Sequence, residues 1–333
     1  MEKENLDIID ITKFVMSFMV VGIHTLGNNG IYPLFRIAVP LFFMISSYLF
    51  FCNITFDKNG DKKLKKFCIR NIKLYIFWFI VLSPIFLYFG NYLRGNILLN
   101  VIKLVIKIIF GSSFVASWYI VALIIDISFI YFFIKSNQNF KVMLLVSFFI
   151  YIICCLNSNY RNLLSEKSII VMINIIYPGT IYNSFLVGLF WVSLGYIFTQ
   201  KNIYDKKICK IGLLFSILLL MGEYHVVTKY HLTVDNDCYF MLIPVCYFIF
   251  KILVNCKWKS KKVNTKLLRK YSTIIYCIHG SLAQIVGYYL IFEINFINNI
   301  LKFFIVMIMS LVLANIICKL EKRETFRLLR YSY

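Results

Sequence analysis

Long apolar runs separated by short polar segments extend along the whole chain. A membrane-spanning helix needs roughly 20 mainly apolar residues. Ten runs approach that length: 11–27, 34–54, 74–93, 116–134, 141–157, 183–200, 208–225, 237–255, 271–292 and 299–318. The pattern therefore predicts an all-α integral membrane protein with about ten transmembrane helices.

Two segments between these runs are more than plain loops. In residues 97–110, Asn100, Lys103 and Lys107 recur at helical spacing within an apolar stretch, which predicts an amphipathic helix lying in the outer interface. Residues 158–182 combine polar and apolar stretches and are expected to form an outer lid or a half-buried helix.

Composition supports the membrane assignment. The 333 residues are 60% hydrophobic and 15% charged, whereas soluble domains are about 45–50% apolar and about 25% charged. No linker or tandem repeat interrupts the pattern, so residues 1–333 are expected to form a single transmembrane domain with no appended soluble domain. The ten cysteines show no metal-ligand spacing, and no metal site is expected.

The distribution of positive charge orients the chain. With a cytoplasmic N-terminus, most lysines and arginines fall in inner segments, at 58–73, 135–141, 201–210, 257–270 and 319–330. The outer segments hold far fewer: Arg94, Lys103, Lys107, Arg161, Lys167 and Lys229. By the positive-inside rule both termini are expected to be cytoplasmic. The net charge of +21 is then a topology signal and a contact for anionic lipid, and no nucleic-acid partner is expected.

Ionisable side chains inside the apolar runs are candidate functional groups, because each costs about 2.5–3.5 kcal/mol at the centre of a span for Arg, Lys or Asp. Lys13 opens the first run and His24 lies eleven positions further on. Imidazole takes and gives a proton near neutral pH, so His24 is a candidate for acid–base or covalent catalysis.

Four further motifs accompany this pair. Arg36 precedes Val39-Pro40-Leu41-Phe42-Phe43 and Ser46-Ser47-Tyr48 at the head of the second run. Arg70 and Lys73 lie in a basic segment, Ser117-Trp118-Tyr119 opens the fourth run, and Ser272, Tyr276 and His279 lie in the ninth.

Together, these motifs resemble the acyltransferase-3 family of membrane acyltransferases, whose superfamily includes the membrane half of vancomycin-resistance serine racemases. The family carries an arginine and a histidine in its first span, a Val-Pro-x-Phe-Phe-x-x-Ser-Gly-Tyr element and an inner Arg-x-x-Arg. Here Lys13 and Lys73 replace two family arginines, which keeps the charge but loses the two-pronged donor suited to phosphate. Ser47 replaces the glycine before Tyr48.

The resemblance implies transfer of an acyl group, by default acetyl, from cytoplasmic acyl-CoA to a hydroxyl of an extracytoplasmic sugar or cell-envelope glycan. His24 would be the catalytic residue, and Lys13, Arg70 and Lys73 would bind the coenzyme A phosphates. The implied setting is the bacterial cytoplasmic membrane, and the implied partners are the lipid bilayer and an envelope glycan or lipid-linked sugar. Further substrate or structural candidates are Arg36, Ser46, Tyr48, Trp118, Tyr119, Asp126 and His279.

Structural roles stay open for the same residues. His24 and His279 are also consistent with buried histidines that bond a neighbouring helix, and Lys13 with a side chain that snorkels to the interface. Arg70 and Lys73 also fit a topology signal, and Trp118 and Tyr119 fit interfacial aromatics. We expect Arg36 to form an ion pair, with Glu223 or Glu293 as partner.

Two other functions remain open. A transporter of a small polar solute, for example an amino acid, would use Asp126, with helices broken near Pro84 or Pro244. A structural partner in polysaccharide export would tolerate substitution of Lys13 and His24.

Overall fold

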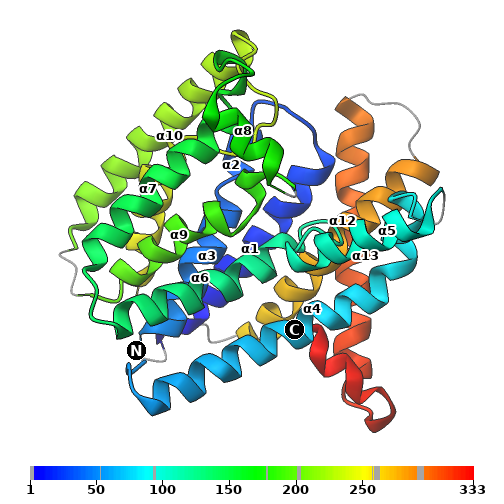
Figure 1. The fold of residues 1–333 in the computed structure, drawn as a ribbon. Helices are drawn as coiled ribbons and strands as arrows, with labels where there is room; N and C mark the ends of the chain where they lie inside the picture. Colours follow the sequence, from blue (N-terminus) through cyan, green and yellow to red (C-terminus); the bar gives the residue numbers. More distant parts are fainter. Residues whose placement is uncertain are drawn as a thin grey trace. The chain divides into compact units, whose positions relative to one another are not determined.

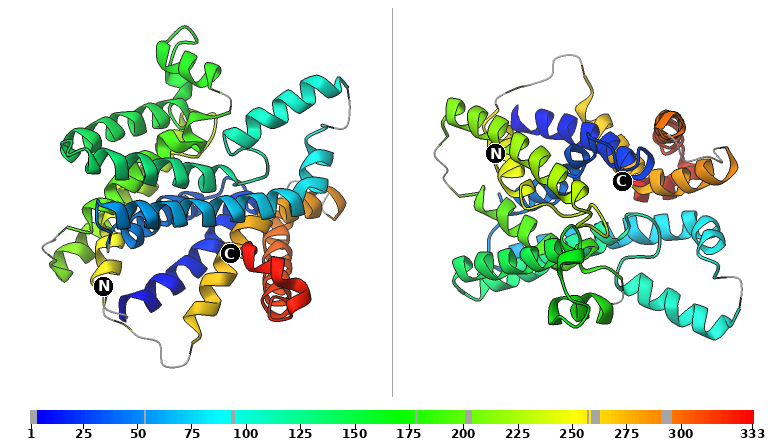
Figure 2. Two further views of the ribbon diagram at one scale, coloured as in Figure 1. Left: turned by 60° about the horizontal axis from the view of Figure 1, so that its bottom comes forward. Right: turned by 90° about the horizontal axis from the view of Figure 1, so that it is seen from above.

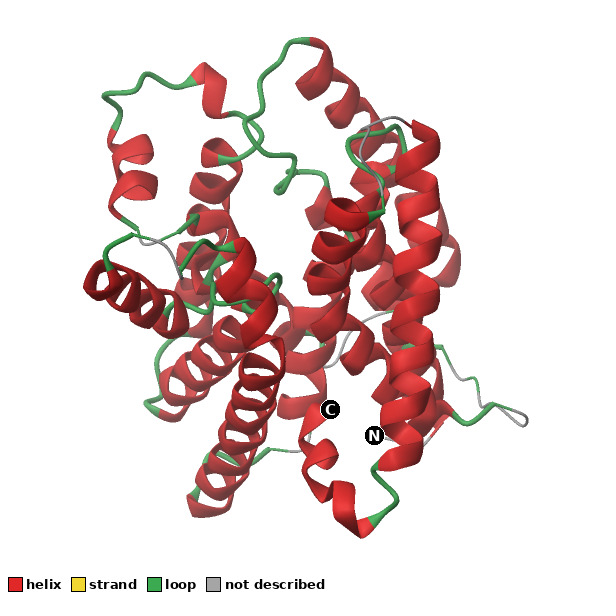
Figure 3. Cartoon of the chain, turned by 90° about the vertical axis from the view of Figure 1, so that its right-hand side faces the viewer, coloured by secondary structure: helices red, strands yellow, loops and turns green. Residues whose placement is uncertain are grey.

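The computed structural model describes residues 4–52, 54–92, 95–177, 179–200, 204–256, 258, 263–290 and 296–333. Within these ranges the chain is helical and contains no strand (Figures 1 and 3). The all-α prediction is therefore confirmed.

A helix occupies each of the ten predicted spans. The helices are α1 (Glu4–Thr25), α3 (Ala38–Phe51), α4 (Lys58–Phe89), α6 (Trp118–Lys135), α7 (Phe140–Asn157), α9 (Phe185–Ile197), α10 (Lys206–Lys229), α11 (Leu242–Val254), α12 (Thr265–Tyr289) and α13 (Phe296–Leu320). In the described residues, seven helical segments are long and apolar enough to cross a membrane, and α9 and α11 are shorter apolar helices. The count of ten spans and the cytoplasmic termini stay predictions.

Helix α4 differs from the sequence-based expectation. The basic segment 58–73, expected as an inner loop, forms the first half of this 32-residue helix. Pro84 lies inside α4 without ending it, and Pro244 lies in the first turn of α11. Neither proline breaks a helix in the way that the transporter hypothesis required. The left view of Figure 2 shows α4 as one uninterrupted helix.

The two segments between spans are partly helical. The predicted amphipathic helix is α5 (Ile97–Ile109), which buries none of its residues. Segment 158–182 contains the short helices η1 (Arg161–Leu163), α8 (Ile169–Ile176) and part of η2 (Ile181–Asn183). Pro178 and Arg94 lie outside the described residues, as do Glu293 and parts of the basic segments 201–210 and 257–270.

Polar side chains fix where many of these helices begin. An N-cap side chain accepts a hydrogen bond from a backbone N–H that has no partner within the helix. Among the residues that the structure describes, six helices begin in this way, at Asn96, Asn139, Ser168, Ser184, Asp205 and Asn264. Asp57 precedes α4 and accepts hydrogen bonds from the backbone N–H groups of Asn59 and Gly60, both at 2.9 Å.

The chain separates into two compact units that interleave in sequence. The first comprises residues 1–9, 36–67 and 122–259, and the second comprises 10–35, 68–121 and 260–333. In the first unit α3 packs against α9, α9 against α7, and α10 against α11. Glycines allow the close approach of α3 and α9, since a Cβ at Gly188 would meet Phe43 and one at Gly195 would meet Met44. The single-domain prediction stays untested.

In the second unit α12 and α13 pack side by side, and η3 (Glu324–Ser332) packs against α13. The Trp78 indole donates a hydrogen bond to the Ser332 carbonyl at 3.0 Å. Lys270 donates to Glu321 at 2.6 Å and to Tyr333 at 2.7 Å. These bonds hold the C-terminal segment against α4 and α12.

Candidate active site

His24 and His279 lie next to each other in the second unit. His24 belongs to the last turn of α1 and is exposed, whereas His279 belongs to α12 and is fully buried. Their ring centroids are 5.1 Å apart and the rings are inclined by 42°. Two candidate residues separated by more than 250 positions in the sequence are thus brought together.

Two tyrosines extend this site along α12 and into α6. The ring of Tyr276 lies 5.9 Å from that of His279 and 5.3 Å from that of Tyr119. The Tyr276 hydroxyl donates a hydrogen bond to the carbonyl of Ala116 at 2.8 Å. Tyr276 therefore connects His279 to the segment that precedes α6.

The backbone of that segment is tightly constrained. Ala116 adopts a φ of 64°, a left-handed conformation that is costly for alanine. The side chain of Val115 lies so close to Gly280 that any Cβ at this position would clash with it. Backbone strain of this kind is concentrated at functional sites, so it is consistent with a site at this end of α12.

Positive charges gather around the middle of α1. Lys13 is partly buried and lies within electrostatic range of Asp10, Arg70 and Arg269. Arg269 Nη1 is 3.9 Å from Asp10 Oδ2. Three cations, from α1, α4 and α12, therefore lie near one another, and Asp10 is the acidic neighbour of Lys13 and Arg269. The positive charge that remains is suited to an anion.

Arg269 was not predicted as a site residue. It precedes Lys270 in the basic segment 257–270, where its charge is indistinguishable in sequence from a topology signal. Only the packing of α12 near α1 distinguishes Arg269 from its neighbours. Lys270, by contrast, donates hydrogen bonds to Glu321 and Tyr333.

Lys73 is placed one turn beyond Arg70 on α4. Its ammonium group lies 5.1 Å from the centroid of the Tyr331 ring, in a cation–π arrangement. Tyr331 belongs to η3, so the C-terminal segment contributes to the surroundings of this predicted cation.

The histidine pair lies at the C-terminal end of α1, and Lys13 lies about three turns earlier, near the middle of this helix. Eleven residues separate Lys13 from His24, which is roughly 16 Å along α1 at 1.5 Å per residue. An elongated molecule with an anionic head and a reactive tail matches this separation.

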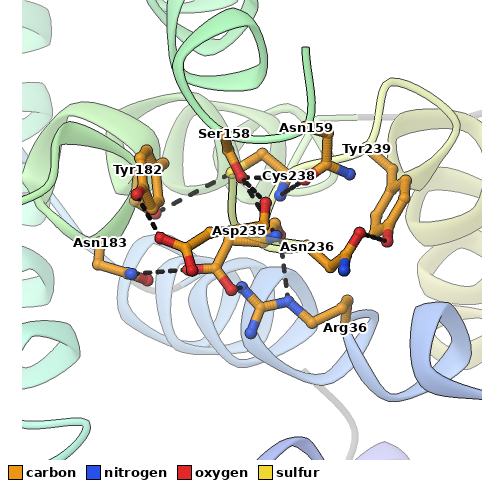
Figure 4. Close-up of polar contacts among 10 residues, drawn as sticks. Arg36, Ser158, Asn159, Tyr182, Asn183, Asp235, Asn236, Cys238 and Tyr239 are labelled. Atoms are coloured by element: carbon orange, nitrogen blue, oxygen red, sulfur yellow. Dashed lines mark hydrogen bonds and ion pairs between the residues drawn. The ribbon is translucent and has the colours of Figure 1, made fainter. Parts of the chain in front are cut away.

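The first unit holds a second polar cluster, around Arg36 (Figure 4). The Arg36 guanidinium forms an ion pair with the Asp237 carboxylate, and Arg36 Nε donates to the Asp237 carbonyl at 3.1 Å. The predicted ion pair thus exists with Asp237, and not with Glu223. Glu223 instead accepts hydrogen bonds from the backbone N–H groups of Phe240 and Met241, both at 2.7 Å.

Hydrogen bonds join this Arg36 cluster to segments 158–159 and 182–183. Tyr182 donates to Asp235 at 2.5 Å, and Asn183 donates to Asp237 at 2.7 Å. Burial, together with the hydrogen bond to Asp235, raises the pKa of the Tyr182 phenol. Because most of these polar groups pair with one another, the cluster fastens four chain segments, at Arg36, 158–159, 182–183 and 235–239, and supports a structural role for Arg36.

The remaining candidates also lie in the first unit, apart from Trp118. Ser46 and Tyr48 belong to α3, and Tyr48 is buried with its ring 5.7 Å from that of Phe250. Between them, Ser47 donates a hydrogen bond to the carbonyl of Val192 in α9 at 2.6 Å. The serine that replaces the family glycine therefore strengthens the contact between α3 and α9. Trp118 is partly buried at the start of α6.

Asp126 is a buried carboxylic acid in α6. It is 1% exposed, it lies against Gly188 of α9, and neither of its oxygens has a hydrogen-bond partner in the described part of the chain. A buried acceptor without a partner costs about 1–3 kcal/mol.

Comparison with known proteins identifies the family. A family model of the acyltransferase-3 type, described as an acyltransferase domain, matches residues 6–319. The chain is 27% identical over 267 residues to an amino-acid racemase of Enterococcus faecalis, covering 76% of this chain and 36% of that protein. A second racemase from the same organism is 25% identical over 339 residues, covering 95% and 46%.

A serine/alanine racemase of Enterococcus gallinarum is 24% identical over 321 residues, covering 91% of this chain and 44% of that protein. The chain thus spans less than half of the length of each of these relatives. No solved structure matches it.

Proposed function

The chain belongs to the acyltransferase-3 family of multi-pass membrane proteins, and on that premise we propose that it is an O-acyltransferase. Its donor is cytoplasmic acyl-CoA, with acetyl as the transferred group. Its acceptor is a hydroxyl of an extracytoplasmic sugar or cell-envelope glycan. The protein works in the bacterial cytoplasmic membrane, where the bilayer and an envelope glycan or lipid-linked sugar are its partners.

The observation that carries this proposal is the placement of His24. The ring centroid of a second histidine lies 5.1 Å from that of His24, and three cations gather around Lys13, about three turns earlier on the same helix. Lys13, Arg70 and Arg269 bind the phosphates of coenzyme A as charge-assisted donors, and Lys73 adds to the positive field. The pantetheine arm then extends along α1 and presents the thioester to His24.

The chemical step is nucleophilic attack on the thioester. The acceptor hydroxyl is a weak nucleophile, and His24 removes its proton as the oxygen attacks the carbonyl carbon. A C–O bond forms and the C–S bond breaks. The thiolate of coenzyme A then takes the proton from His24, which returns the ring to its neutral form.

The test is turnover by the purified protein in lipid vesicles. Labelled acetyl-CoA is supplied, and free thiol release and transfer of label to envelope glycans are followed. We expect His24→Ala to lose at least about 10²-fold in turnover, the lower end of the usual contribution of a general base. The control is His225→Ala, which removes an exposed histidine of α10. Equal turnover in wild type and His24→Ala would remove His24 from the mechanism.

A transporter of a small amino acid is the second candidate. The observations that favour it are the unpartnered carboxylic acid of Asp126 and the likeness to proteins named as amino-acid racemases. Uptake of labelled serine or alanine into vesicles, lost in Asp126→Asn and retained in His24→Ala, would support this function. Thiol release without uptake would reject it.

A further inference from the structure

The protonation of the buried histidine follows from its hydrogen bond. His279 Nδ1 lies 3.1 Å from the backbone carbonyl oxygen of Ile275, one turn earlier in α12. A carbonyl oxygen accepts and cannot donate, so Nδ1 carries the hydrogen of the ring. In the neutral ring, Nε2 then holds a lone pair.

That lone pair has no partner within the described residues. His279 is 0% exposed, and its Nε2 makes no hydrogen bond in the described part of the chain. Buried hydrogen-bond acceptors almost always have a donor. A buried ring nitrogen without one therefore indicates a position at which a donor binds in another state of the protein.

The neighbouring His24 ring can supply such a donor, because a neutral imidazole carries one N–H group. With ring centroids 5.1 Å apart, a rotation that turns one nitrogen of each ring toward the other would bring the two nitrogens to a hydrogen-bond distance of about 3 Å. The other titratable groups beside the pair are Tyr276 and Tyr119, and the Tyr276 hydroxyl already donates to Ala116.

We propose that His279 is a positioning residue for His24, with its Nε2 accepting the N–H of the His24 ring during acyl transfer. This inference rests on the proposed function. The bond leaves the other nitrogen of His24 as the unprotonated one, which faces the acceptor hydroxyl. When His24 takes the hydroxyl proton, both of its nitrogens carry hydrogen, and His279 stabilises the resulting cation.

Protons and bonds balance without His279 titrating. The hydroxyl proton moves to His24 and then to the thiolate of coenzyme A, while one C–O bond forms and one C–S bond breaks. Throughout the reaction His279 Nδ1 keeps its hydrogen and donates it to the Ile275 carbonyl, while His279 Nε2 acts only as a hydrogen-bond acceptor for His24.

Two amide substitutions separate this role from a structural one. In His279→Gln the amide oxygen takes the place of Nε2, so the acceptor is kept and the bond to Ile275 is lost. In His279→Asn the amide nitrogen takes the place of Nδ1, so the bond to Ile275 is kept and the acceptor is lost. His225→Asn is the matched control at an exposed histidine.

We expect kcat of His279→Asn to fall about 10²-fold with KM for acyl-CoA unchanged, and kcat of His279→Gln to stay within about tenfold of wild type. Turnover in His279→Asn that equals or exceeds that of His279→Gln would overturn the proposal, because the bond to Ile275 would then be the important one.

An activity-independent measurement separates failure of this inference from failure of the proposed function. The chain has four histidines, so nitrogen NMR of the ¹⁵N-histidine-labelled wild type resolves their tautomers. We expect hydrogen on Nδ1 of His279; hydrogen on Nε2 would refute the pairing whether or not the protein turns over acyl-CoA.

Diethylpyrocarbonate labelling gives a second such measurement. We expect His24 to react about threefold more slowly in His279→Asn than in wild type, because loss of the acceptor lowers the basicity of the other nitrogen of the His24 ring. Equal labelling rates in His279→Asn and His279→Gln would count against the pairing. Absence of turnover in wild type, with these signatures present, would reject only the acyltransferase function.

Discussion

At the scale of single residues, the main consequence of the structure is that Arg269 joins the predicted cations. Its guanidinium lies close to Asp10 and within electrostatic range of Lys13 and Arg70. A planar guanidinium binds phosphate through two parallel hydrogen bonds, which lysine cannot do. If the chain binds acyl-CoA as proposed, Arg269 would restore some of the phosphate-binding geometry that is lost where Lys13 and Lys73 replace family arginines.

Removing this guanidinium should weaken donor binding. We expect Arg269→Gln to raise the KM for acyl-CoA about tenfold with little change in kcat, since one charge-assisted hydrogen bond contributes about 1.5–3 kcal/mol. The matched control is Lys266→Gln, which removes the same charge from an exposed position on the same helix. Steady-state kinetics in vesicles measures both. An equal rise in KM in the two variants would indicate a general electrostatic effect.

Sequence reasoning found some of these residues and missed others for a physical reason. His24 and His279 stand out because an ionisable group within an apolar run is costly and rare. Arg269 does not, because a cation beside other cations at a helix start is what the positive-inside rule already expects. Its role depends on which helix lies beside it, and spacing in the chain does not encode that.

At the scale of elements, α4 shows where hydropathy misleads. Its first half is rich in lysine, and hydropathy therefore predicts a loop there, yet lysine is a good helix former. Hydropathy locates the apolar part of a helix and says nothing about how far the helix continues beyond it. The helix begins where Asp57 supplies a cap, which is a local backbone signal.

This cap should make the start of α4 sensitive to acid. Hydrogen bonds from the backbone N–H of Gly60, and then from the Thr55 hydroxyl, lower the pKa of the Asp57 carboxyl. A carboxyl whose pKa is lowered in the folded state stabilises the fold at pH values above its pKa in the unfolded chain, about 3.9. This stabilisation is lost as the pH falls through the pKa of the folded state.

We therefore expect thermal stability in detergent to fall more steeply below about pH 4 in wild type than in Asp57→Asn. Asparagine caps a helix as well as aspartate does but does not titrate, so the two proteins should be nearly equal at pH 7. Asp61 titrates in both and cancels in the comparison. Parallel pH profiles would show that the cap does not contribute.

At the scale of the whole molecule, the two compact units divide the candidate residues between them. The second unit contains the histidine pair and the cations, and the first contains the Arg36 cluster and Asp126. The units interleave in sequence, because α1, α4 and α6 each contribute to both. The apolar runs alone predicted a single domain and gave no sign of this division, since hydropathy repeats equally through both units.

Topology is the prediction that belongs to this scale. With an even number of spans and both termini cytoplasmic, fusions of green fluorescent protein at the N- and C-termini should both fluoresce. Alkaline phosphatase fused after Ser165 should be active, because that position lies in a segment expected outside, whereas a fusion after Ser136 should be inactive. Alkaline phosphatase activity of a fusion at the C-terminus, together with a fluorescent fusion at the N-terminus, would require an odd number of spans.

Helix α5 has a consequence of a different kind. None of its thirteen residues is fully buried, and hydrogen bonds join it to Tyr75 and Tyr92, so much of the free energy that holds α5 in place is expected to come from its surroundings. Its apolar face is complete only when acyl chains cover it. Thickness and fluidity of the surrounding leaflet should therefore set how often α5 unravels. Amide hydrogen exchange in this helix would then change with lipid species while the rest of the protein stays protected.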